Sequence, residues 1–220
     1  IMNKDTKVLA LKYRPQIFED LIGQEVVTQT IMNSIKRIHS TKMKNSDSNI
    51  NIYSNYCNKM KSRRNNYNYN YFKNFENDYK DIFNKLKQYE DNQKGKQVVI
   101  HGDPVLTNIL INNFGKIKFI DMRGKIGSIT TIYGDYLYDW AKLYQSLIGY
   151  DKILQDKIIN TSYERKMINH FKKYFLDSYS DDEFEYLKTI TKSLLLTLIP
   201  LHNNTKCQLY YNLIESEYLL

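Results

Sequence analysis

Apolar residues recur at intervals of three and four along much of this 220-residue chain. Within residues 25–42 the repeating positions are Val26, Val27, Thr30, Ile31, Ser34, Ile35 and Ile38. Within residues 71–92 they are Phe72, Phe75, Tyr79, Ile82, Phe83, Leu86 and Tyr89. Because this spacing places apolar side chains on one face of a helix, it predicts an amphipathic helix in each stretch. Gly95 is expected to stop the second helix.

The region after residue 150 has the same helical period. It predicts helices at 151–159, 162–177, 181–198 and 204–219. Ser180 followed by Glu183 has the spacing of a capping box, which predicts the start of the third of these helices. Pro200 is expected to separate the last two, because the residue before a proline is driven out of the helical region.

Two short apolar runs, 97–101 and 117–121, predict β-strands. We expect these strands to form a small β-hairpin. Further along, Asp135 or Asp139 can cap another helix, whose buried side chains would include Trp140. Together the elements predict an α+β fold that is mostly helical.

Composition limits the class of protein. The mean hydropathy is −0.58, and no apolar run approaches the roughly 18–20 residues that a membrane span needs. The opening residues lack the apolar core of a signal peptide. Cys57 and Cys207 have neither metal-site nor disulfide-framework spacing. We therefore expect a soluble, cytoplasmic protein with reduced thiols and no membrane span.

The net charge of +8 is concentrated in the first part of the chain. Residues 1–96 contain 18 Lys and Arg against 10 Asp and Glu, whereas the remaining residues contain 14 of each. An AT-rich coding sequence would also enrich lysine, so a solvated basic face is the favoured interpretation of this charge. Residues 43–70 are rich in Asn, Ser, Lys and Tyr, with Asn-Tyr alternation at 65–70. Arg63 and Arg64 beside the tyrosines fit either a nucleic-acid strip or a variable substrate-side insertion or loop, and the second is favoured. Nucleic acid is therefore not the expected partner.

Chemically useful side chains gather around the two predicted strands. Asp103 follows the first strand, Asn108 lies five residues later, and Asp121 ends the second strand. Carboxylate and amide oxygens suit Mg²⁺, and a carboxylate can accept the proton of a hydroxyl group. These are components of a phosphoryl-transfer site.

The order of these motifs resembles a known family. The matching residues are His101-Gly102-Asp103, Asn108, Ile120-Asp121, Gly134-Asp135, Asp139 and Ala141. They are similar to the aminoglycoside phosphotransferase and choline kinase family, in the branch found with bacterial capsule and surface-polysaccharide loci. The resemblance covers residues 37–220. It implies a protein-kinase-like C-terminal lobe in which the small hairpin carries the catalytic loop.

The resemblance also implies a role for each residue of the site. Asp103 would be the catalytic base, and Asn108 and Asp121 would be the metal ligands that hold Mg²⁺ and the phosphates of ATP. Arg123 departs from the family's pattern, and its side chain would either contact a phosphate or an anionic substrate or pair with Asp135.

Three further residues are expected to be structural. His39 matches the first helix of the lobe. His101 would hold the catalytic loop by hydrogen bonds, and Asp139 would brace that loop from a neighbouring helix.

Residues 1–36 resemble a different family. The matching residues are Lys12-Tyr13-Arg14-Pro15, Phe18 and Asp20-Leu21-Ile22-Gly23-Gln24. They are similar to the start of the bacterial DNA polymerase III clamp-loader gamma/tau subunit. The phosphate-binding loop that should follow in that family does not occur. No kinase N-terminal lobe, with its nucleotide-covering loop and strand lysine, is recognisable either. That lobe is expected to be largely missing, so we predict weak or no ATP binding by this chain alone.

The sequence therefore predicts a clamp-loader-like segment, 1–36, and a phosphotransferase lobe, 37–220. The expected function is Mg²⁺- and ATP-dependent phosphorylation of a hydroxyl on a small molecule, a sugar or an amino alcohol, in surface-polysaccharide metabolism. Two alternatives are a fragment of a gamma/tau-like replication protein and an inactive chimeric fusion.

Overall fold

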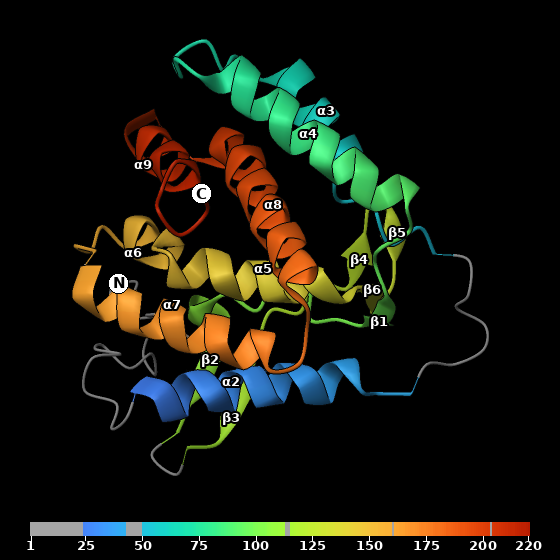
Figure 1. Cartoon of the computed structure of the whole chain (residues 1–220), viewed down its shortest axis with the longest axis vertical. Helices are drawn as coiled ribbons and strands as arrows, with labels where there is room; N and C mark the ends of the chain where they lie inside the picture. The colour runs from blue at the N-terminus through green and yellow to red at the C-terminus, as the bar shows by residue number, and fades with distance from the viewer. Residues whose placement is uncertain (1–23, 43–49, 113–114, 160, 203) are drawn as a thin grey trace, which may run out of the picture.

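The computed structural model describes residues 24–42, 50–112, 115–159, 161–202 and 204–220. The clamp-loader match over residues 12–23 lies outside these ranges. The described chain is mostly helical and carries three small antiparallel sheets, so the predicted α+β class is confirmed. In Figure 1 the helices make up most of the body, and the short strands lie at its edges.

Most helices begin and end close to where the apolar periodicity places them. They are α2 (Gln24–His39), α3 (Cys57–Asn66), α4 (Phe75–Asp91), α5 (Tyr136–Leu147), α6 (Tyr150–Leu154), α7 (Thr161–Leu176), α8 (Asp181–Leu198) and α9 (Asn204–Ile214), with 3-10 turns η3 (Leu106–Asn108) and η4 (Ile199–Leu201). The bounds of α8 agree with the prediction at both ends. Its capping box is present, with Glu183 N–H donating to Ser180 Oγ at 3.2 Å. α6 and α9 are shorter than predicted, each by five residues at its C-terminal end.

The centre of the molecule is α5. Leu137, Trp140, Ala141 and Leu143 of this helix are all 0% exposed. α8 packs across α5, and α4 and α9 contact α8 in turn (Figure 1). Because a helix buried on nearly all sides cannot shift without disturbing several neighbours, α5 is a rigid support for the residues it carries.

α2 packs against α7 and belongs to the same core. Val27, Ile31, Met32 and Ile35 are buried in the main apolar cluster. The two helices lie side by side (Figure 1), and Lys36 Nζ donates to the hydroxyl of Ser178 at 2.6 Å, just beyond the end of α7. The helix is continuous across residue 36, where the two sequence resemblances meet.

The strands pair differently from the prediction. They are β1 (Gln97–Val99), β2 (Ile109–Ile111), β3 (Ile117–Phe119), β4 (Lys125–Ile126), β5 (Ile129–Thr130) and β6 (Tyr133–Asp135). β1 pairs with β6, β2 with β3, and β4 with β5, all antiparallel. The predicted hairpin between 97–101 and 117–121 is therefore wrong.

Local turn chemistry explains this pairing. β2 follows η3 directly, and the chain reverses between Asn112 and Gly115, whose N–H donates to Asn112 O at 2.9 Å and whose φ is +73°. A tight turn of this kind favours pairing between neighbouring strands. β1 pairs with β6 partly because Gly134 has no side chain, since a Cβ there would lie 2.4 Å from Ile100 Cδ1.

Helix α3 was not predicted. Its sequence has no regular apolar stripe, and only Cys57 and Met60 are buried. Residues 57–66 are therefore not a loop, one of the two structural alternatives expected for 43–70. Tyr56, directly before the helix, fixes the position of its first turn. The hydroxyl of Tyr56 donates to Asp135 Oδ2 at 2.6 Å.

Candidate active site

The loop that follows β1 carries the predicted base, and its backbone leaves no room for a side chain at Gly102. This glycine has φ +81°, and a Cβ built on it would lie 2.7 Å from Cβ of Arg123. Only glycine tolerates both the left-handed backbone and the close contact. The N–H of Arg123 donates to the carbonyl of His101 at 2.9 Å, so the loop is also tied to the segment after β3.

Asp139 on α5 holds this loop by hydrogen bonds to its backbone. Its carboxylate accepts the N–H of His101 at 2.8 Å and that of Gly102 at 2.7 Å. It also bonds Nε2 of His39 at 3.1 Å, and it is 0% exposed. The expectation that Asp139 braces the loop is confirmed. His39 is a structural partner, because its ring also packs edge-on against Trp140 with centroids 5.8 Å apart.

Asp103 extends from the braced loop as an accessible carboxylate. Its side chain is 37% exposed, and Lys142 Nζ lies 2.9 Å from Oδ1. The amide of Asn108 donates to the carbonyl of Asp103 at 3.0 Å and to Oδ2 at 3.3 Å. The N–H of Asp103 donates to Nδ1 of His101 at 3.3 Å, so His101 orients the loop. The side chain is thus fixed in position and partly exposed, although its Oδ1 atom is buried beside Lys142.

The structure brings Asn108 and Asp121 together through the backbone. The N–H of Ile120 donates to the carbonyl of Asn108 at 3.0 Å, which places Asp121 one residue further along. Asp121 has φ +58°, unusual for a residue with a side chain, and it is exposed. Such backbone conformations are enriched at functional sites.

The oxygens of Asn108 and Asp121 suit an ion such as Mg²⁺, which needs few protein ligands, better than a metal that is held by protein ligands alone. Among the described residues, no group of three His, Cys, Asp or Glu side chains could hold a metal. Mg²⁺ usually takes only one or two protein ligands and completes its shell with water and phosphate oxygens. The amide nitrogen of Asn108 faces Asp103, which leaves its amide oxygen for such an ion. The oxygens of Asn108 and Asp121 have the chemistry that Mg²⁺ prefers, and their role as metal ligands stays a prediction.

Arg123 lies beside the same loop. Its Nη1 donates to the hydroxyl of Tyr138 at 2.5 Å, and its guanidinium carbon lies 5.6 Å from the centre of that ring. It does not pair with Asp135, whose carboxylate instead accepts hydroxyl groups of Tyr56 and Tyr89 at 2.6 and 2.7 Å. Of the two alternatives for Arg123, contact with a phosphate or an anionic substrate stays a prediction.

Helix α3 carries two further cations, Lys59 and Arg63, and Tyr56 directly before it packs against Tyr138, the partner of Arg123, with ring centres 6.0 Å apart. Lys59 is partly buried, and its pKa is held well below the ordinary value for lysine, first by burial and then by the charges of Lys142, Arg123 and Arg63. The carboxylate of Asp103 acts on it in the opposite direction. Lys59, Arg63, Arg123 and Lys142 are called the cation cluster below.

Sequence reasoning missed three members of the cation cluster. Lys142 could have been found, because it lies three residues after Asp139 and so projects from the same face of α5 as the brace. Lys59 gave no signal, and Arg63 was noted only as part of a basic and aromatic strip, since the helix that carries both has no apolar period.

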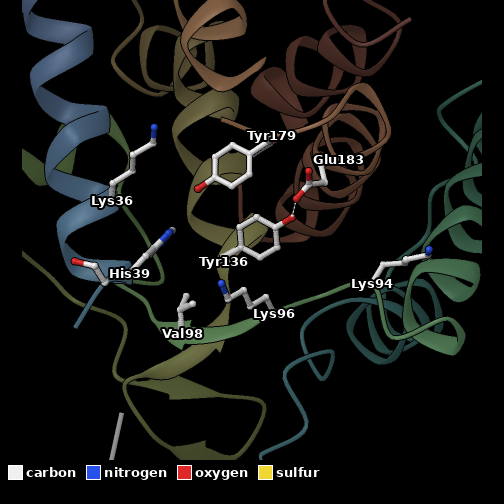
Figure 2. A pocket seen from close by; sticks show the side chains of 9 residues that line it. Lys36, His39, Lys94, Lys96, Val98, Tyr136, Tyr179 and Glu183 are labelled. Carbon is white, nitrogen blue, oxygen red and sulfur yellow. Dashed lines mark hydrogen bonds between the residues drawn. The ribbon is translucent and has the colours of Figure 1, made fainter. Parts of the chain in front are cut away.

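A cavity of about 480 Å³ lies on the other side of the brace. Figure 2 shows Lys36 and His39 of α2 facing Tyr136, Tyr179 and Glu183, with Lys96 near the floor. The hydroxyl of Tyr136 donates to Glu183. Neither Asp103 nor the cation cluster lines this cavity, so it is separate from the candidate active site. The two are linked by the bond between His39 and Asp139.

No helix in the described part of the chain is long and apolar enough to cross a lipid bilayer. No protein-family model matches the sequence, and neither a curated protein nor a solved structure is significantly similar to it.

Proposed function

We propose that this chain is a Mg²⁺- and ATP-dependent phosphotransferase that acts on a hydroxyl group of a small molecule, such as a sugar or an amino alcohol. The observation that carries the proposal is the braced loop. Asp139 fixes the backbone of His101 and Gly102 from α5, and this positions the accessible carboxylate of Asp103. Fixed geometry of this kind is how phosphoryl-transfer enzymes lower the barrier, because the protein supplies mainly positioning and charge.

Each residue has a defined task in the reaction. The acceptor hydroxyl oxygen forms a bond to the γ-phosphorus as the bond to ADP breaks, and its proton passes to the carboxylate of Asp103. Asn108 and Asp121 would hold Mg²⁺, which when bound neutralises charge on the phosphates. Arg123 and Lys142 add positive charge beside the reacting group. Metabolism of surface polysaccharides is the setting that the sequence resemblance suggests.

The test is transfer of phosphate from millimolar Mg²⁺-ATP to a panel of sugars and amino alcohols, followed by mass spectrometry. Asp103→Ala should lower the rate by about 100-fold or more, because it removes the proton acceptor. The matched control is Asp91→Ala, which removes an exposed carboxylate of α4. Equal rates in the wild type and Asp103→Ala, or no transfer to any acceptor by the folded wild type, would contradict the proposal.

Calorimetric titration with Mg²⁺-ATP separates binding from transfer. We expect weak binding, because the described residues include no strand lysine under a glycine-rich loop to grip the nucleotide. Micromolar affinity would contradict this expectation and would show that other residues of the chain bind the nucleotide.

A further inference from the structure

The cation cluster contains more positive charge than the carboxylate beside it can balance. Lys142 pairs with Asp103, and Arg123 donates to the neutral hydroxyl of Tyr138. Across the described ranges, no carboxylate pairs with Lys59 or Arg63. The ring of Tyr56, directly before α3, lies 6.0 Å from the ring of Tyr138, the partner of Arg123, so α3 begins beside Arg123. Of the four cations in the cluster, Lys142 is the one that pairs with a carboxylate of the described chain.

This arrangement costs free energy in the free protein. Lys59 and Arg63 are four residues apart on α3, a spacing at which like charges destabilise a helix. Burying a cation without a partner costs more. The lowered pKa of Lys59 is a direct consequence of that burial and of the neighbouring cations. A bound anion would remove the cost.

The other face of α3 is different. Arg64 pairs with Glu76 at 2.6 Å and lies over the ring of Tyr79. Lys61 lies over the ring of Phe83, with 5.2 Å between its Nζ and the ring centre. The cations on that face are exposed and are used for packing against α4. The same short helix thus carries two basic pairs, of which one has protein partners and the other does not.

We propose that Lys59, Arg63, Arg123 and Lys142 bind a phosphate group next to Asp103, and that this phosphate belongs to the acceptor molecule. Arg and Lys are the side chains that recognise phosphate, and guanidinium groups do so with two parallel hydrogen bonds. The acceptor would then be a phosphorylated small molecule with a free hydroxyl group, such as a sugar phosphate.

The position of α3 is the reason for assigning the phosphate to the acceptor. α3 contacts α8, whereas β3, which leads to the metal ligand Asp121, contacts α2. In Figure 1 these two regions lie on opposite sides of α5. The carboxylate that acts on Lys59 is Asp103, the group that would receive the acceptor proton. This half of the inference rests on the proposed function, whereas binding of a phosphate group does not.

The first experiment tests phosphate binding without nucleotide or metal. The full chain is titrated calorimetrically with sodium pyrophosphate. The double variant Lys59→Gln/Arg63→Gln should weaken binding by about tenfold or more, since it removes two charged phosphate contacts. Lys61→Gln/Arg64→Gln is the matched control, because it removes the same charge from the same helix, and it should change affinity less than about twofold.

Two outcomes overturn the inference. One is equal weakening in the two double variants, which would indicate only a diffuse basic surface. The other is no pyrophosphate binding by the wild type. Lys59→Arg/Arg63→Lys keeps both charges and should keep most of the affinity. If the Gln pair fails to fold by circular dichroism, Lys59→Gln and Arg63→Gln are measured singly and judged by the same criteria.

A second titration identifies the source of the phosphate. Glucose 1-phosphate should bind more tightly than glucose, and the Lys59→Gln/Arg63→Gln variant should lose that difference while its Mg²⁺-ATP affinity stays within about twofold. If ATP affinity falls and glucose 1-phosphate is unaffected, the phosphate belongs to the nucleotide and the acceptor assignment is wrong.

Asp103→Asn separates this inference from the proposed function. The substitution removes the carboxylate that now pairs with Lys142, so pyrophosphate should bind more tightly even though phosphate transfer is lost. A chain that binds pyrophosphate through Lys59 and Arg63 but transfers no phosphate would contradict the proposed function alone. A chain that transfers phosphate, but whose pyrophosphate affinity is unchanged by the substitutions of Lys59 and Arg63, would contradict this inference alone.

Discussion

Two carboxylates that contact α5 have opposite surroundings. Asp135 is 1% exposed and accepts hydrogen bonds from the hydroxyls of Tyr56 and Tyr89 and from the N–H groups of Lys96 and Leu137. Asp103 is partly exposed and faces cations. The first carboxylate is surrounded by neutral donors, and the second by more positive charge than it can balance.

The difference separates a carboxylate with structural partners from the one that we propose to be functional. At Asp135 each oxygen accepts two donors, and the group anchors Tyr56 and therefore the start of α3. Neutral donors satisfy a buried carboxylate without adding charge. At Asp103 the surplus of cations has no structural benefit, so a ligand is the expected partner. The tyrosines around Asp135 thus hold in place the helix that carries Lys59.

The same substitution at the two carboxylates is the strongest test of this comparison. Asp135→Ala leaves four donors without an acceptor, and it should lower the free energy of unfolding by roughly 3–5 kcal/mol. Asp103→Ala removes a partly exposed ion pair and should change the free energy of unfolding by less than about 1 kcal/mol. Urea unfolding followed by circular dichroism measures both. Similar losses at the two positions would show that Asp103 is structural.

The pH dependence of the free energy of unfolding should depend on the ionisation of the Asp135 carboxyl. Burial raises the pKa of this carboxyl, and the hydrogen bonds from the tyrosines only partly oppose it. The folded state therefore holds the proton more tightly than the unfolded state. Its contribution to stability is complete below the ordinary carboxyl pKa of about 4, and it is lost as the pH rises through the raised value.

Asp135→Asn should flatten this fall in a series of urea unfolding curves at increasing pH. Part of the slope should remain, because burial also raises the pKa of Asp151. A slope that is identical in the variant and the wild type would show that Asp135 ionises normally in the folded protein.

The smallest expected effect is a gain in stability. Lys59→Met removes a partly buried cation with no carboxylate partner in the described chain, and it should stabilise the free protein by about 0.5–1 kcal/mol at neutral pH. Lys61→Met on the exposed face should be close to neutral. Thermal unfolding with and without pyrophosphate is the measurement. Pyrophosphate should raise the unfolding temperature of the wild type more than that of Lys59→Met. A Lys59→Met variant less stable than the wild type would contradict the conclusion that the cations near Asp103 have no structural benefit.

Local sequence signals predicted most of the helices. The capping pair Ser180 and Glu183 and the apolar period of α2, α4, α7 and α8 were sufficient, because these helices bury one continuous face. The pairing of β1 with β6 could not be predicted in the same way. It depends on a glycine, Gly134, that lets Ile100 pack closely, and this is a contact between distant segments.

The candidate site was only partly visible from sequence. Asp103, Asn108, Asp121 and Arg123 lie in one short stretch, so their motif was readable. The cations of α3 were not, since the position of that helix depends on Tyr56 reaching Asp135, 79 residues along the chain.

α2 has a practical consequence for anyone who works with this chain. The family resemblance suggests a division at residue 36, but the folding unit does not end there. Ile31 and Ile35 are buried against the rest of the molecule, and His39 shares the carboxylate of Asp139 with the catalytic loop. A fragment cut at residue 37 would keep the motif and lose its support. The sequence resemblances and the folding unit therefore divide this chain at different places, and a shortened version for the laboratory should start before Gln24.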